Sequence, residues 1–307
     1  MEDARFSPRT GHTDRMGKKR RILSALLLVA GAVGVALLAL RPTEPSEPIY
    51  QGKPLSVWLK EGYGSPPLAP ASVSAAENAL RALGTNALPF LTTMAASRDS
   101  PLKTGLIHLA RKQHFFKVNI TRADERRGYA MSAFHFLRAD AKSAIPALIK
   151  PLNDGESAEA VAFILADIGP DGLGPLTNAL TNSDWKVRAS VVIGLGRFAK
   201  PYYRDEYPVS PSELDSLAKI IVPVLVNSLH DPDLHVRHFA AMSLGWFASE
   251  DESICVEAAL ALEKCGAEAQ DAVPGLLQAL RKQHGVSAVS NALKAIDPAA
   301  AAKAGIK

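Results

Sequence analysis

Hydrophobic and polar residues divide the chain into a short apolar stretch near the N-terminus and a long region with helical periodicity. Residues 22–40 read ILSALLLVAGAVGVALLAL and contain no charged side chain. From Pro54 onward, apolar residues recur at three- and four-residue spacings, as they do along one face of an α-helix. The pattern predicts a helical body over residues 54–307, preceded by one apolar helix.

The body contains a recurrent short signature of an apolar residue, a proline, a variable residue and a leucine. Proline is tolerated in the first turn of a helix, because its missing N–H would have no intrahelical partner there. Each copy therefore predicts a helix start. The copies begin at Leu88, Ile145, Val222 and Val273, and Gly174-Pro175-Leu176 is a weaker one.

A second signature follows most copies of the first, and it is an alanine-rich helix that ends in glycine. It covers residues 76–84, 160–169, 187–196, 236–245 and 258–266. Glycine at such a position predicts a left-handed helix C-cap. A single pair of helices cannot bury its apolar stripe, so the pairs must stack on one another. The predicted fold class is all-α, an α-solenoid of stacked antiparallel helix pairs.

Two segments of the body share one pattern, an aspartate followed four residues later by an arginine and then by a glycine-containing helix end. Asp184-Trp185-Lys186-Val187-Arg188 precedes Gly194-Leu195-Gly196, and Asp233-Leu234-His235-Val236-Arg237 precedes Leu244-Gly245. These segments resemble repeats of the HEAT family, which has an armadillo-type fold and includes the short HEAT-like repeats of bilin lyases. The resemblance covers residues 71–297. It implies that Asp184 and Asp233 cap second helices, and that Arg188 and Arg237 join a ladder of polar contacts between repeats.

Elementary chemistry supports these roles. An aspartate at a helix N-cap accepts a backbone N–H and favours the positive end of the helix. Arg188 and Arg237 then lie about one turn into the helix, where each could reach a carboxylate on the preceding repeat. The alternative role for both arginines is contact with a ligand.

The apolar residues 22–40 are long enough to span a membrane, because nineteen residues at about 1.5 Å each cover roughly 28 Å. The basic cluster Lys18-Lys19-Arg20-Arg21 precedes them, which predicts a cytoplasmic tail over residues 1–21 and an extracytoplasmic body, periplasmic in a bacterium. A cleaved signal peptide is the competing interpretation, and Met16 is an alternative start codon. Residues 41–53 contain three prolines and predict an extended linker. Together with the HEAT-like repeats, this layout resembles membrane-anchored bacterial HEAT-repeat proteins.

Charge and motifs narrow the functional classes. The net charge is +4, and residues 1–21, with seven basic and three acidic side chains, account for all of it. A neutral body argues against a nucleic-acid groove, including that of HEAT-type DNA glycosylases. The sequence contains no G-x-S-x-G, H-E-x-x-H, P-loop or G-x-G-x-x-G motif. We therefore expect a non-catalytic scaffold for a protein partner, without a cofactor; the resemblance implies, as the alternative, a bilin-lyase-like enzyme or a chaperone-like adaptor for a cofactor-carrying protein.

Four aromatic residues are candidates for partner contact. Tyr202, Tyr203 and Tyr207 lie in the irregular segment 200–213, and tyrosine offers rigid contact area with a polar tip. They could instead fold back over apolar repeat surface. Trp185 follows a helix cap, and its alternative role is packing between repeats.

Two further groups of residues have side chains that could support metal or redox chemistry. His230, Asp231, Asp233, His235 and His238 could suit zinc, but Asp233 is already assigned as a cap, so no metal is predicted. Cys255 and Cys265 would lie about 15 Å apart on one continuous helix, beyond the roughly 7 Å limit for a disulfide. Two thiols are expected, unless the helix breaks between them.

Overall fold

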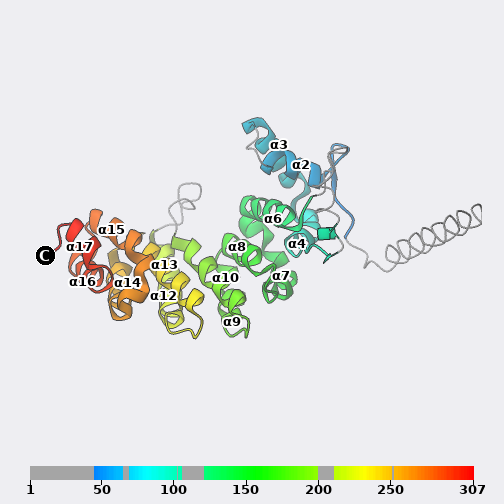
Figure 1. Ribbon diagram of the computed structural model, residues 1–307. Helices are drawn as coiled ribbons and strands as arrows, with labels where there is room; N and C mark the ends of the chain where they lie inside the picture. Colours follow the sequence, from blue (N-terminus) through cyan, green and yellow to red (C-terminus); the bar gives the residue numbers. More distant parts are fainter. Residues whose placement is uncertain (1–44, 65–68, 102, 106–120, 200–210, 251) are drawn as a thin grey trace, which may run out of the picture. The chain divides into compact units, whose positions relative to one another are not determined.

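The computed structural model describes residues 45–64, 69–101, 103–105, 121–199, 211–250 and 252–307 (Figure 1). The chain divides into residues 1–45 and 46–307, and the second unit contains the described helices. The segment 22–40, expected to span a membrane, lies outside the described residues. Among those that are described, no helix combines the length and apolar character needed to cross a bilayer.

The second unit opens with a β-hairpin that packs on the first helix, α2 (Leu55–Tyr63). Strand β1 (Ile49–Tyr50) pairs antiparallel with β2 (Lys53–Pro54). The indole Nε1 of Trp58 donates to the carbonyl oxygen of Tyr50 at 3.1 Å, and the two rings meet edge to face at 5.9 Å. The end of the segment expected as a linker, residues 49–53, is therefore folded against α2.

The remaining described helices follow in chain order, with short 3₁₀ turns between several of them. They are α3 (Pro70–Leu83), α4 (Leu88–Ala95), α6 (Ala123–Leu137), α7 (Ile145–Leu152), α8 (Ala158–Ile168), α9 (Leu173–Ala179), α10 (Trp185–Gly196), α12 (Pro211–Ser228), α13 (Leu234–Glu250), α14 (Glu252–Cys265), α15 (Val273–Arg281), α16 (Val286–Ile296) and α17 (Pro298–Lys303). The 3₁₀ turns are η1 (Gly84–Ala87), η2 (Arg138–Ala144), η3 (Pro170–Gly172), η4 (Arg197–Ala199) and η5 (Gly266–Ala272).

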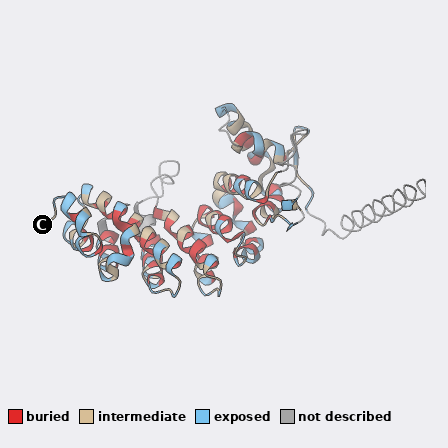
Figure 2. Cartoon of the chain, viewed as in Figure 1, coloured by how far each residue is buried: buried red, intermediate tan, exposed pale blue. Residues whose placement is uncertain are grey.

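These helices stack as an α-solenoid in two rows. The second row consists of α6, α8, α10, α13 and α15, each packed on the one before it. The first row consists of α4, α7 and α9, followed by α12, α14 and α16. Buried residues lie on the facing sides of the helices in Figure 2, and the buried apolar side chains form one cluster that runs from Leu55 to Ala301. The predicted all-α fold class is confirmed, and the apolar stripes are buried by stacking.

The proline signature marks helix starts at three of the four full copies. α4, α7 and α15 begin at the apolar residue before the proline, and the weaker copy lies in the first turn of α9. The prediction at Val222 is wrong, because α12 begins at Pro211 and continues through Pro223. An internal proline costs about 3 kcal/mol. Burial of Ile221, Val222 and Leu225 around an exposed Pro223 holds the helix together there.

The glycine signature marks helix ends at three of its five copies. Gly84, Gly169 and Gly266 have positive φ of 53°, 98° and 54°, a backbone region that favours glycine. The ψ angles of −134° at Gly84 and −148° at Gly169 lie outside the left-handed helical region, so the left-handed conformation predicted for these two caps is wrong. Gly196 and Gly245 do not end their helices in this way, because α10 continues into η4 and α13 continues to Glu250. Both glycines instead allow close packing. A Cβ atom on Gly245 would lie 3.0 Å from the Cα of Ala272, and one on Gly196 would meet Ser243.

The order of the two signatures is reversed after α13. The alanine-rich helix α14 packs in the first row, against α12 and α16, whereas the proline-led helix α15 packs in the second row, against α13. α13 ends at Glu250 and α14 begins at Glu252, so no additional helix separates them. The two rows therefore exchange their sequence signatures at this junction, which we call the α13–α14 junction.

Candidate functional site

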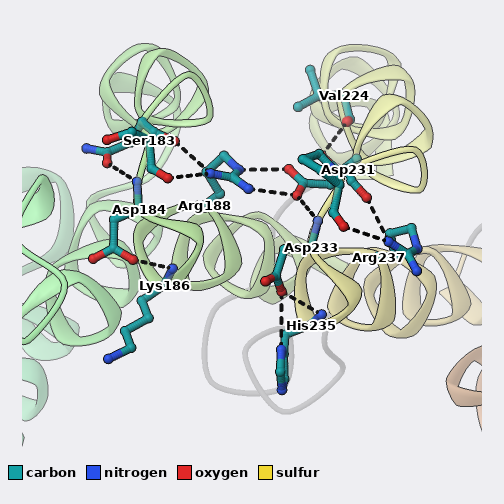
Figure 3. A network of polar contacts seen from close by, with 12 residues as sticks. Ser183, Asp184, Lys186, Arg188, Val224, Asp231, Asp233, His235 and Arg237 are labelled. Atoms are coloured by element: carbon teal, nitrogen blue, oxygen red, sulfur yellow. Dashed lines mark hydrogen bonds and ion pairs between the residues drawn. The ribbon is translucent and has the colours of Figure 1, made fainter.

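Arg188 joins two successive helix pairs through an ion pair with Asp231 (Figure 3). Its Nε donates to Oδ2 of Asp231 and its Nη2 donates to Oδ1, both at 2.8 Å. The third nitrogen, Nη1, donates to the carbonyl oxygens of Asn182 and Ser183 at 2.8 and 3.1 Å. Because Asp231 lies in the turn between α12 and α13, the carboxylate belongs to the following helix pair, whereas the sequence suggested the preceding one.

The surroundings of this pair favour the charged forms of both groups. Each side chain is only 12% exposed. Hydrogen bonding from Arg188 lowers the pKa of Asp231, and the backbone N–H of Asp233 adds to this effect, while burial opposes it. The same hydrogen bond raises the pKa of Arg188. The two groups therefore act as a fixed, ionised link between repeats.

Arg237 repeats this geometry 49 residues later. Its Nη1 donates to the carbonyl oxygens of Asp231 and Pro232 at 2.9 and 3.1 Å, the same relative positions that Arg188 uses. Its Nε lies 3.4 Å from Oε2 of Glu268 in η5. The Glu268 side chain is 66% exposed, so water screens this second ion pair much more than the first.

The aspartate caps are also in place. Oδ1 of Asp184 accepts the backbone N–H of Lys186 at 2.9 Å, and Oδ1 of Asp233 accepts that of His235 at 2.8 Å. Two residues before each cap, Asn182 and Asp231 accept the backbone N–H of the capping aspartate. The ion pair of Asp231 with Arg188 was missed from the sequence. The sequence pattern that could have indicated a polar role is a side-chain acceptor six residues before each arginine, Asn182 before Arg188 and Asp231 before Arg237.

Similar polar contacts join other successive pairs along the same turns, and we call the whole set the polar ladder. In each contact, one of the two residues lies in a turn of the following helix pair. The contacts are Arg98 with Asp154, Arg127 with Glu156, Asn182 with Asn153, Arg188 with Asp231, Arg237 with Glu268, His238 with Asp271, and Gln270 with Asp297. The ladder thus runs from the turn after α4 to the start of α17.

The indole of Trp185 stacks on the imidazole of His235, with ring centroids 4.6 Å apart and an interplanar angle of 21°. Trp185 begins α10 and His235 lies in the first turn of α13, so the stack joins two repeats. The His235 side chain remains 61% exposed, and Lys186 points to the same side of the ladder in Figure 3. The other candidates for partner contact, Tyr202, Tyr203 and Tyr207, lie outside the described residues.

A buried carboxylate at the opposite ends of the second-row helices was missed from the sequence. The Asp167 side chain is 3% exposed and lies 3.2 Å from Nη2 of Arg197 and 3.4 Å from Nδ1 of His135. The Arg197 guanidinium also lies over the ring of Phe163, 4.3 Å from its centroid. Burial lowers the pKa of Arg197, while Asp167 opposes that shift. The signal was one acidic residue on the buried side of an otherwise apolar helix end.

The other residues with side chains suited to metal or redox chemistry are engaged in contacts within the fold. Asp231 pairs with Arg188, Asp233 caps α13, and His238 pairs with Asp271. Over the described ranges, no group of three or more histidine, cysteine or acidic side chains is arranged to hold a metal ion. Cys255 and Cys265 lie on the single helix α14 and are not joined by a disulfide. Burial raises the pKa of the Cys265 thiol.

Comparison with known proteins agrees with this geometry. The family model for HEAT repeats matches residues 175–263. These residues run from α9 into α14 and include Arg188 and Arg237. This part of the chain is therefore similar to HEAT repeats. A search of curated proteins returned no matching relative.

Proposed function

We propose that the protein is a non-catalytic scaffold that binds a protein partner on the extracytoplasmic side of a membrane. The main support for this proposal is the polar ladder, together with the similarity of residues 175–263 to HEAT repeats. HEAT repeats generally mediate protein–protein interaction. In this chain the charged groups of the ladder bind one another. A partner would therefore bind other residues on the outer surface of the stack.

The ladder also supports a scaffold on energetic grounds. Arg188 binds two carbonyl oxygens in the turn before its own helix and, at the same time, the carboxylate of Asp231 in the next helix pair. Such contacts hold successive repeats in one arrangement before any partner arrives. A preorganised surface binds with a smaller loss of conformational entropy than a flexible one.

The partner surface that we propose includes Trp185 and its stack on His235, together with Tyr202, Tyr203 and Tyr207. The stack is an aromatic pair at the surface, with Lys186 beside it. Aromatic side chains are enriched among residues that dominate binding energy at interfaces. The tyrosines follow η4 in the chain and are proposed from their sequence alone.

Membrane display rests on the apolar residues 22–40 and the basic residues before them. In this arrangement the segment 41–48 connects the span to the hairpin at Ile49–Pro54, which is folded on α2. A topology reporter fused after Lys307 should read extracytoplasmic, and a cytoplasmic signal would overturn the membrane part of the proposal.

Partner binding is tested by cross-linking the full-length chain in its native membrane and identifying the attached proteins by mass spectrometry. We expect a reproducible partner whose yield falls at least severalfold in the double variant Trp185→Ala, His235→Ala and in a deletion of residues 200–213. Lys264→Ala, at an exposed position on α14, is the matched control and should leave the yield unchanged. Equal yields in all variants would refute the proposed surface, and the absence of any cross-linked protein would refute the scaffold.

A further inference from the structure

We draw no further inference here: the strongest candidate, the exposed apolar patch of Val256, Leu260 and Val286 where α14 packs against α16, carries nothing because nothing in the structure shows what covers it.

Discussion

Arg188 and Asp231 are 43 residues apart in the sequence and form a two-bond ion pair in which each side chain is 12% exposed. The pair joins the turn before α10 to the turn before α13, so it links two repeats and also organises the turns of both. Because the guanidinium of Arg188 also binds two backbone carbonyls, its loss affects more than one ion pair.

Removal of Arg188 should destabilise the fold strongly. Arg188→Ala leaves Asp231 without its cation and two turn carbonyls without their donor, and we expect a loss of about 2–4 kcal/mol in the free energy of unfolding. Urea denaturation followed by circular dichroism measures this. Glu268→Ala removes the exposed partner of Arg237 and should cost less than about 0.5 kcal/mol. Equal losses in the two variants would contradict the assigned roles.

The contribution of Asp231 should depend on pH. The folded-state pKa of Asp231 lies below its ordinary value of about 3.9, so its stabilisation is fully present above that value and is lost as pH falls through the folded pKa. The stability difference between the natural protein and Asp231→Asn should be constant from about pH 6 to 5 and shrink towards about pH 3. The midpoints of urea unfolding of both proteins across this pH range measure the stability difference. A difference that grows on acidification would contradict the prediction.

An extra methyl group at Gly245 should be harmful, although alanine is the better helix former. Gly245→Ala places a Cβ atom 3.0 Å from the backbone of Ala272, and overpacking of this kind costs about 1–3 kcal/mol. Gly128→Ala is the control, because a Cβ atom there meets nothing within 4 Å inside α6. That variant should gain roughly 0.5–1 kcal/mol from helix propensity. Thermal and urea unfolding of both proteins should therefore shift in opposite directions.

Neutralisation of Asp167 should weaken the joint between α6, α8 and α10. Asp167→Asn keeps the shape of the side chain but removes the charge that faces Arg197 and His135, and we expect a loss of about 2–4 kcal/mol. Asp171→Asn in η3 is at an exposed position and should change stability by less than about 0.5 kcal/mol. Hydrogen exchange should rise at the C-terminal ends of the three helices in the first variant. Unchanged protection there would exclude a linking role.

The stack of Trp185 on His235 should appear as a coupling energy between two repeats. In a double-mutant cycle with alanine at both positions, we expect a coupling of about 0.5–1.5 kcal/mol in the free energy of unfolding. Circular dichroism of the same variants shows whether the proteins used in the cross-linking experiment are folded. Strictly additive losses would mean that the two rings only lie near each other.

The sequence predicted the repeated local features well, because their causes are local. Proline at the start of α4, α7 and α15 and glycine after α3, α8 and α14 act through their own backbone geometry. The predictions at Val222 and Gly245 were wrong because the structure at these positions depends on contacts with distant parts of the chain. The surroundings of these residues, buried neighbours at Pro223 and the close backbone of Ala272, are set by helices from elsewhere in the chain.

The candidate site was predicted in part. Asp184, Arg188, Asp233 and Arg237 lie at the repeated turns that the sequence indicated, but the direction of the contacts depends on how one repeat is placed on the next. Asp167 has no repeated counterpart among the motifs, and only the packing of α6 and α10 around α8 brings His135 and Arg197 to it.

The α13–α14 junction limits how this chain can be rebuilt. A helix pair excised from the N-terminal side and inserted after α14 would place its proline-led helix in the second row, although that helix packs in the first row at its original position. A single additional helix at the junction would turn every later helix to the opposite side. The repeats on the two sides of α13 are therefore not interchangeable modules, and any shortened or lengthened version of the molecule must keep this junction whole.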